Sequence, residues 1–395
     1  MKNIIIAPPF WLLVILIGFP QISETIYTPA LPQLAEHLHT SGNWMQASLS
    51  IYFAGFALGG LLWGRLADQQ GRRPAMLYGV GLFIIGSAGC LLAPAIHWFL
   101  VSRFVQAAGA AAGQVVTQTV LLDCFTDTRR ARVFAAMFAV LAFSPALGPL
   151  MGGFITQYLG VAAVFLTLIL LGAVIVTATF YKLGETRPPA IVSHQPLRVT
   201  AGKMLRDPHI WITGAWIGIM NGIVFSFYGE APFIFIHHFG FTSSQYGFIG
   251  ICEASSAFVG AMFNRHLMKR YSGPAIIRMG IGVMLSGSMV LTVISQLPLP
   301  PVWFISGFVC SIFVIFCGSG MALPHCLSNA LTHYEDALGR AGAILMLYYY
   351  IVIGMVTGIM SWLHSDQLTV LPVFFLVLTS IMWLLSRMQI KQQPG

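Results

Sequence analysis

The stretch Gly64-Arg-Leu-Ala-Asp68-Gln-Gln-Gly71-Arg72-Arg73-Pro74 joins two long apolar runs, at residues 45–66 and 75–95. Its two glycines permit a tight reversal of the chain between two helices. Asp68, near the end of the first helix, can pair with a basic side chain or cap a neighbouring helix amino terminus. The spacing therefore predicts a structured, charged turn between two membrane-spanning helices.

Apolar runs recur along the whole chain, and their lengths match the roughly 20 residues that a helix needs to cross a bilayer. The first run begins like a signal peptide but continues to Ile26 without a small-residue cleavage pattern, so we expect it to be the first helix. We expect twelve spanning helices, at residues 8–28, 45–66, 75–95, 98–121, 134–156, 161–181, 209–229, 245–264, 275–296, 302–323, 340–362 and 371–387.

The composition points to the same class of protein. Of the 395 residues, 57% are hydrophobic and 8% are charged, whereas an average soluble domain carries about 25% charged residues. The segments between the apolar runs are too short to hold a sizeable soluble domain. We therefore predict an all-α polytopic membrane protein.

The longest polar interval falls in the middle of the predicted helices. It covers residues 182–208 and separates an amino-terminal six-helix half, residues 1–181, from a carboxy-terminal half, residues 209–395. Basic residues interleaved with apolar ones predict a short helix along the membrane surface in this linker. Duplicated halves are common in secondary transporters. A weak repeat supports them here, because at a constant offset Gly60, Arg65, Pro74 and Ala75 match Gly260, Arg265, Pro274 and Ala275.

The basic residues predict the orientation in the membrane. With the amino terminus in the cytoplasm, every Lys and Arg except Arg103 falls on the cytoplasmic side, as the positive-inside rule requires. Both termini are then expected to be cytoplasmic. The net charge of +8 is explained by this orientation, and no nucleic-acid partner is expected.

The charged turn strongly resembles the signature G-x-L-x-D-x-x-G-R-R of the major facilitator superfamily. The resemblance implies a twelve-helix fold of two pseudo-symmetric six-helix halves. It also implies that the turn acts as a latch between the halves when the outer side is open. The residues that carry this latch here are Gly64, Asp68, Gly71, Arg72 and Arg73.

Two further segments resemble motifs of the twelve-helix drug:proton antiporters in this superfamily. Arg103-Phe-Val-Gln106-Ala-Ala-Gly109 is similar to the R-x-x-Q-G motif, with the glycine displaced. The segment 144–153 resembles the antiporter motif of helix five, where proline and glycine permit a kink and close packing against the other half. The motif residues here are Pro145, Gly148, Pro149, Gly152 and Gly153.

The end of the first helix narrows the resemblance. Ser23-Glu24-Thr25-Ile-Tyr27-Thr28-Pro29-Ala30-Leu31-Pro32 is similar to S-T-D-M-Y-L-P-A-L-P of the bicyclomycin/chloramphenicol-resistance-type branch, and also resembles the wider multidrug facilitator group. Thr25 stands where the branch has its aspartate, and Glu24 precedes it. Because one residue turns a helix by about 100°, the proton-carrying arrangement of the branch cannot be transferred unchanged. Gln118 also replaces an arginine that the branch often carries.

Three acidic residues fall in or near the predicted spans and away from the cytoplasmic loops: Glu24, Glu230 and Glu253. A low dielectric favours the neutral form of a carboxyl group, so such residues can take up and release protons. We expect Glu24 to lead proton coupling or substrate contact; the alternatives are solvation at the outer mouth and a structural pair with Arg103. The alternative for Glu230 is solvent exposure, and for Glu253 it is a buried structural hydrogen bond.

Polar residues within the predicted helices indicate a cavity between the two halves. Residues 21, 24, 25 and 28 form a polar stripe on one face of helix one. Arg103 is expected to face the cavity or, as the alternative, to extend to the outer interface. The expected lining residues are Gln21, Thr25, Thr28, Tyr52, Phe56, Arg103, Gln106, Gln114, Gln118, Asn221, Tyr228 and Tyr348.

No motif in the sequence suggests catalysis or metal binding. A Walker loop, an HExxH pair and a nucleophile elbow are all missing, and the six cysteines lack metal-ligand spacing. His237 and His238 are expected to be solvated loop residues. We expect no enzyme activity, no metal and no cofactor, and as partners only small-molecule cargo, protons and the lipid bilayer, with the protein a monomer.

These features together predict a proton-coupled secondary transporter of the bacterial inner membrane, driven by the proton gradient. The expected activity is antiport by alternating access, with export of lipophilic drug-like compounds or of a secreted metabolite such as a siderophore. The alternative on the same fold is a proton symporter that imports a nutrient or a metal chelate. A membrane-embedded enzyme or receptor is disfavoured by the missing catalytic constellation and the short loops.

Overall fold

The computed structural model describes residues 7–125, 133, 136–137, 144–187, 197–332, 334 and 338–390, without the side chains of 144–145, 197–199, 338–340 and 388–390. Over this part of the chain the structure is helical and has no β-strand. Eleven helical stretches there are long and apolar enough to span a membrane. The prediction of an all-α polytopic protein is confirmed.

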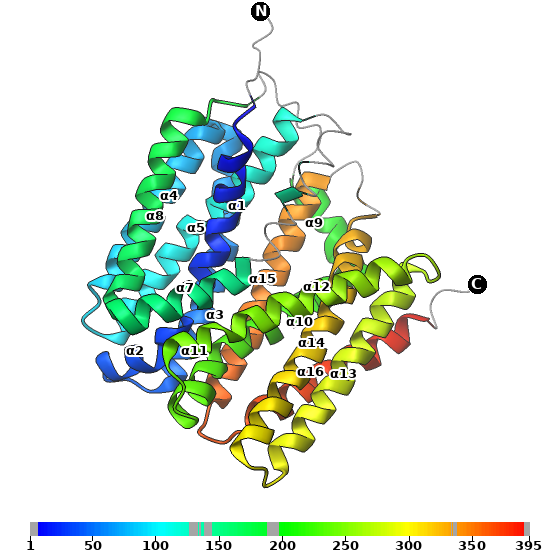
Figure 1. Ribbon diagram of the computed structural model, residues 1–395. Helices are drawn as coiled ribbons and strands as arrows, with labels where there is room; N and C mark the ends of the chain where they lie inside the picture. The colour runs from blue at the N-terminus through cyan, green and yellow to red at the C-terminus, as the bar shows by residue number, and fades with distance from the viewer. Residues whose placement is uncertain are drawn as a thin grey trace, which may run out of the picture.

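The first half consists of helices that run alternately up and down (Figure 1). Its first span contains Pro20 within α1 and continues through a short 3-10 turn into α2. The span expected at 134–156 begins largely outside the described residues, and its second part is α7. The elements are α1 (Phe10–Thr25), η1 (Thr28–Ala30), α2 (Leu31–His37), α3 (Gly42–Gln70), α4 (Arg72–Leu91), α5 (Ile96–Cys124), α7 (Ser144–Leu159) and α8 (Val161–Lys182).

The second half repeats this plan after the linker, which contains the short helix α9 (Leu197–Leu205). Met204 of α9 is buried in the second half, so the linker helix is anchored to the protein. The elements of the second half are α10 (Pro208–Pro232), η2 (Phe233–His238, a π-helical turn), α11 (Ser243–Gly247), α12 (Ile249–Leu267), α13 (Gly273–Gln296), α14 (Pro301–Ala330), α15 (Leu338–Leu363) and α16 (Val370–Ile390).

Buried apolar side chains form two separate clusters, one for each half. The first cluster consists of residues from the first half together with Met346, Tyr350 and Ile353 of α15. The second cluster extends from Met204 to Met382. In Figure 1 the first half (blue to green) and the second half (green to red) stand beside each other, and orange α15 lies between them. Helix α15 is therefore the element that joins the two cores.

The direction of the helices gathers the basic turns at one end of the bundle. There α3 ends and α4 begins, α8 leads into the linker, and α12 is followed by Lys269 and Arg270. We call this the basic end. The other end, where α2, η2 and α11 lie, is called the distal end (Figure 1).

Glycines allow the backbones of neighbouring helices in the first half to touch. A methyl group at Gly109 of α5 would meet the backbone of Phe83 and Gly79 in α4. Gly55 and Gly59 of α3 lie in the same way against the backbone of α5. Lipid offers no hydrophobic drive for helix association, so small residues that permit such close approach hold a membrane bundle together.

Gly109→Ala tests this packing, because its methyl group has no space unless α4 and α5 separate. We expect a loss of about 1–3 kcal/mol in the free energy of unfolding, measured by denaturant titration of the purified protein. Gly81→Ala on α4 is the matched control: its methyl would meet nothing within 4 Å, and the helix should keep or gain stability. Equal stability of the two variants would contradict the packing argument.

Candidate functional site

Among the described residues, Arg103 of α5 is the largest side chain that is completely buried, with an exposed fraction of 0%. Its guanidinium lies between two aromatic rings, 3.9 Å from the ring centre of Tyr27 and 4.3 Å from that of Tyr52. Such contacts stabilise a desolvated cation by about 2 kcal/mol. The alternative that Arg103 extends to the membrane interface is therefore wrong.

Hydrogen bonds continue from Arg103 to two neighbouring residues. Its Nη1 donates to Oε1 of Gln106, and Nε2 of Gln106 donates to Oγ of Ser87 on α4 over 2.8 Å. Within the described part of the chain, Nε and Nη2 of Arg103 have no hydrogen-bond partner. The guanidinium thus keeps two nitrogens that can donate to an anionic or carbonyl group.

Glu24 of α1 completes this group and is 3% exposed, so the alternative of a carboxylate solvated at an outer mouth does not hold. It lies close enough to Arg103 for a direct electrostatic interaction, and Tyr52 also interacts with it. A fixed cation and a titratable acid therefore share one buried space. We call Glu24, Tyr27, Tyr52, Ser87, Arg103 and Gln106 the buried polar cluster.

The second half reaches this cluster through two tyrosines of α15. Tyr349 and Tyr350 both interact electrostatically with Glu24. The hydroxyl of Tyr350 donates to Oε1 of Gln114 on α5 over 3.1 Å, and its ring centre lies 4.7 Å from that of Phe56. The cluster is thus built on the first half and capped by the second.

The remaining candidate lining residues lie around the cluster or away from it. Thr25 and Thr28 are buried and donate to backbone carbonyls of their own helix turn, and Gln21 and Gln118 are half-buried. The second-half candidates are not brought to Arg103 by any contact described. Asn221 donates to its own helix at Ile217, Tyr228 packs among Phe225 and Phe227, and Tyr348 donates to the carbonyl of Trp211.

Helix α7 touches both α1 and the second half through its glycines. Methyl groups at Gly148 and Gly152 would collide with Thr25 and with the Ile26 carbonyl, and one at Gly153 with the Ser243 carbonyl of α11. Opposite, Gly247 faces the carbonyl of Pro149. The side chain of Pro145 lies outside the described residues. This motif therefore forms a close contact between the halves at the distal end.

The charged turn between α3 and α4 is built around Arg72, whose side chain is 4% exposed. Its Nη1 lies 2.8 Å from Asp68 and its Nε 2.8 Å from Asp123 of α5. Gly71 has a φ of +113°, which favours glycine, and Gly64 has only Val115 nearby. Arg73 donates to the carbonyl of Phe180 on α8. All these contacts lie inside the first half, and within the described residues the side chains of Asp68, Arg72 and Arg73 form no hydrogen bond or ion pair to the second half.

A second polar group joins the halves at the distal end. Asn43 of α3 donates to the carbonyls of Ser361 (2.8 Å) and His364 (3.0 Å), and Ser361 donates back to Asn43 (2.7 Å). Nδ1 of His364 lies 2.6 Å from Nε2 of Gln46 on α3. The same nitrogen lies 2.9 and 3.0 Å from the two carboxylate oxygens of Glu230 on α10. We call Asn43, Gln46, Glu230, Ser361 and His364 the distal clasp.

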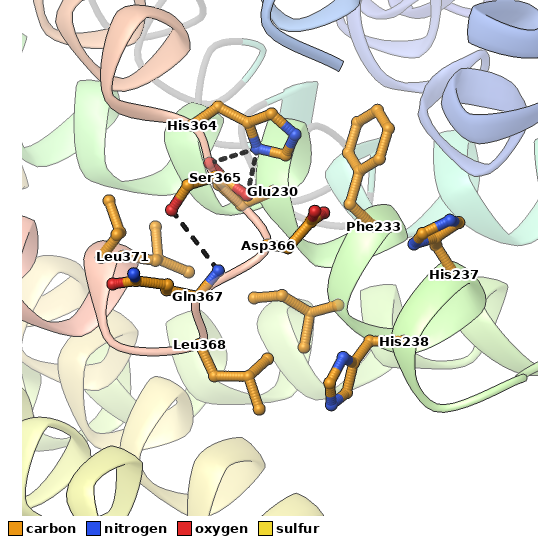
Figure 2. Close-up of a pocket in the computed structure, with 12 residues that line it drawn as sticks. Glu230, Phe233, His237, His238, His364, Ser365, Asp366, Gln367, Leu368 and Leu371 are labelled. Carbon is orange, nitrogen blue, oxygen red and sulfur yellow. Dashed lines mark hydrogen bonds and ion pairs between the residues drawn. The ribbon is translucent and has the colours of Figure 1, made fainter. Parts of the chain in front are cut away.

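Figure 2 shows the ring of His364 directed at Glu230. His237 and His238 line the same pocket from η2. Glu230 is 4% exposed, so the alternative of simple solvent exposure is wrong. At the distal end the two halves are thus joined by hydrogen bonds.

Glu253 of α12 lies in the second half and outside both groups. It is 8% exposed, and its Oε2 has no hydrogen-bond partner within the described residues. Phe227, Phe308 and Phe316 surround it together with aliphatic side chains. A carboxyl group in such surroundings is stable only in its neutral form unless a cation approaches.

Sequence reasoning missed several residues that the structure brings into these groups. Tyr27 lies on the same helical face as Glu24, and this spacing was an available signal. Three tyrosines are consecutive on α15. Tyr349 and Tyr350 face the cluster, whereas Tyr348, which was expected to line the cavity, does not, because each residue turns the helix by about 100°. Nothing in the sequence singles out His364, which takes its role only from partners far away along the chain.

Comparisons with known proteins agree with this architecture. The family described as Major Facilitator Superfamily matches residues 13–387. An "Uncharacterized transporter" of Rickettsia bellii is 32% identical over 384 residues, which cover 95% of each chain. The "Chloramphenicol resistance protein" of Pseudomonas aeruginosa is 25% identical over 387 residues, 97% of this chain and 90% of that one. The "Multidrug resistance protein MdtL" of Escherichia coli O81 is 29% identical over 225 residues, 57% of each.

Solved structures share the fold at low sequence identity. A D-xylose-proton symporter superposes with a TM-score of 0.76 and 14% identity, over 95% of this chain and 97% of that one. The inward-open xylose transporter XylE from E. coli gives a TM-score of 0.73 and 12% identity, over 94% of each. These likenesses concern the arrangement of the helices.

Arg72→Lys tests the charged turn. A lysine ammonium cannot reach Asp68, Asp123 and the Ala67 carbonyl in the planar fork that arginine provides, so buried acceptors lose their donors. We expect a loss of about 1–3 kcal/mol in unfolding free energy, measured by thermal or denaturant unfolding. The exposed Arg65→Lys should change it by less than about 0.5 kcal/mol. An equally small effect of Arg72→Lys would refute the proposed importance of its geometry.

Proposed function

Because the chain belongs to the major facilitator superfamily, we propose that it is a proton-coupled antiporter that exports lipophilic, drug-like compounds. The family and the relatives make the protein a transporter and not an enzyme. Under the proposal, the two halves rock around the buried polar cluster, which is open to each side of the membrane in turn. A secreted metabolite such as a siderophore is a second class of cargo under the same proposal.

The observation that carries the proposal is the burial of Glu24 beside Arg103. Arginine keeps its charge in proteins, so Glu24 is the member of the pair that can gain or lose a proton. When Glu24 is ionised, the two charges compensate each other at a site buried from bulk solvent. When Glu24 takes up a proton, the net charge of the cluster rises by one, and the cation of Arg103 is left without its counter-charge. Protonation therefore changes what the cluster can bind.

The contacts of the cluster link this charge change to the position of the halves. Tyr349 and Tyr350 of α15 interact electrostatically with Glu24. The hydrogen bond from Tyr350 to Gln114 joins the two halves. A different charge on Glu24 alters the energy of these contacts. Opening and closing of the halves is thereby coupled to the proton.

Aromatic side chains beside the cluster suit a lipophilic cargo. The ring centres of Phe53 and Phe225 are 4.5 Å apart, and Tyr350 stacks near Phe53 and Phe56. Sites for small apolar ligands are lined by such side chains with a few polar groups that fix orientation. The names of the relatives, a chloramphenicol resistance protein and a multidrug resistance protein, favour cargo of this kind.

The proposed orientation places the basic end in the cytoplasm of a bacterium, as the positive-inside rule requires, with both termini there. The distal clasp and the α7–α11 contact then close the outer side. The paired charges of the 64–74 turn stay within the first half, which fits a state open toward the cytoplasm. A proton that moves inward releases about 2.3 kcal/mol per 100 mV of membrane potential. In the proposed mechanism this free energy drives export, and the transporter is a monomer.

Glu24→Gln tests the proposal, because glutamine keeps the size of the side chain but cannot release a proton. The purified protein is placed in liposomes with a pH-sensitive dye and an imposed proton gradient, and chloramphenicol is the probe. We expect the wild type to move chloramphenicol against protons, and the variant to lose at least about 90% of the cargo-induced proton flux. Glu36→Gln, an exposed acid on α2, is the control and should keep it.

Two other outcomes would contradict parts of the proposal. Movement of protons and chloramphenicol in the same direction would replace export by import on the same fold. Proton flux that persists in Glu24→Gln would remove Glu24 from the role and transfer it to Glu230 or Glu253, tested by the same substitution at each.

A further inference from the structure

The distal clasp contains a hydrogen-bond conflict centred on one atom. Nδ1 of His364 lies within hydrogen-bond distance of Nε2 of Gln46 and of both oxygens of Glu230. A ring nitrogen has a single in-plane position, which holds either a proton or a lone pair. It cannot accept from Gln46 and donate to Glu230 at the same time.

The two partners belong to different halves of the protein. Gln46 lies on α3 in the first half, whereas Glu230 lies on α10 in the same half as His364. When the neutral ring carries its proton on Nε2, Nδ1 keeps a lone pair, accepts from the Gln46 amide and adds a bond between the halves. The protonated ring has hydrogen on both nitrogens, so Nδ1 donates to Glu230 and the bond to Gln46 is lost, while the Asn43 bonds to Ser361 and His364 remain. The Gln46 amide could turn its oxygen to the ring, but a neutral acceptor competes poorly with a carboxylate for a cationic N–H.

Among the described residues, the charged and titratable groups that line the pocket beside the ring belong to the second half. From α3, the groups that face the ring are Gly42, Asn43 and Gln46, which carry no charge. From α10 comes Glu230, from η2 come His237 and His238, and from the following loop comes Asp366. Phe233 covers one side of the ring at 4.8 Å between ring centres. The side chains of His364 and Glu230 are 9% and 5% exposed, so bulk water offers few replacement partners.

We propose that His364 is a second proton-binding residue, which on protonation exchanges Gln46 of the first half for Glu230 of the second and so weakens the distal clasp. Histidine is the side chain whose charge ordinarily changes between about pH 5 and 8. The inference rests on the proposed transport function for its physiological meaning: acid on the distal side would open that side and admit protons to Glu24. The device itself requires only the geometry of the clasp.

The test measures the separation of the two halves at the distal end as a function of pH. Spin labels are attached to a ketone-bearing unnatural amino acid at Gln33 and Gln296, which are exposed on α2 and at the end of α13, so the native cysteines stay in place. Distances are recorded in lipid nanodiscs at about pH 8 and about pH 5.5. We expect the ratio of long to short distances in the wild type to rise at least about threefold on acidification.

Substitutions assign this change to the clasp. His364→Gln, which cannot take up a proton, should abolish the pH dependence. His237→Gln, in the same pocket but without contact to Gln46 or Glu230, should keep it. If His364→Gln does not fold, Gln46→Leu serves instead: it removes one of the bonds across the halves, so the share of long distances at pH 8 should exceed that of the wild type. A wild type without a pH response, a full response in His364→Gln, or wild-type distances in Gln46→Leu would each overturn the proposal.

Glu24→Gln separates this proposal from the proposed function. It should abolish cargo-coupled proton flux and leave the pH-dependent distance change intact. Loss of the distance change in Glu24→Gln would assign the response to the buried polar cluster and overturn the role of His364. A normal distance change in a protein that moves no cargo would refute the proposed function and leave the switch standing.

Discussion

A guanidinium without access to water must obtain its stabilisation from the protein, and Arg103 imposes this requirement on the whole first half. Two tyrosine rings, a glutamine and a neighbouring carboxyl group surround it. They come from α1 and the turn after it, from α3 and from α5, so these helices have to meet at one depth. The cost of an unpaired charge in low dielectric is several kcal/mol, which is comparable to the stability of an entire domain. The cluster therefore constrains the packing of the helices as much as it provides a site.

Close approach of backbones makes this convergence possible. Glycines on α3 and α5 remove the side chains that would keep the helices apart, and those on α7 let it lie against both α1 and α11. The two halves also approach each other at the distal end, where Asn43 and Ser361 exchange hydrogen bonds. Contacts through small residues and a few polar groups can separate and form again, whereas an interlocked apolar interface would not.

The buried polar cluster and the distal clasp differ in composition and in position. The buried polar cluster pairs a permanent cation with a titratable acid, and α15 lies over it. The distal clasp joins α3 to Ser361 of α15 and to His364, which follows that helix. Helix α15 thus contacts both groups and belongs to both apolar cores. Under the proposed function, a change of charge at either group would act on this one helix and so link protons to the movement of the halves.

Much of the architecture follows from local features of the sequence. The lengths of the apolar runs, the polar interval at 182–208 and the placement of the basic residues predict an all-α membrane protein of two halves, because a bilayer accepts only helices with satisfied backbones and charges avoid its core. Glu24, Arg103 and Gln106 stand out for the same reason: each is a costly polar residue inside an apolar run. A single sequence suffices to predict those features that the bilayer imposes directly, namely helical spans and the placement of charged residues.

The tertiary structure alone decided which of these residues meet. Tyr349 and Tyr350 face the cluster and Tyr348 does not, since the rotation of α15 is set by its packing against α3 and α10. Gln46, Glu230 and His364 are unremarkable in sequence and become a group only because three helices end side by side. Arg103 is buried and not at the interface for a similar reason, as α1 and α3 cover it. The sequence determined which polar and charged residues are costly in free energy within the bilayer. Packing between segments far apart in the chain determined the partners that stabilise them.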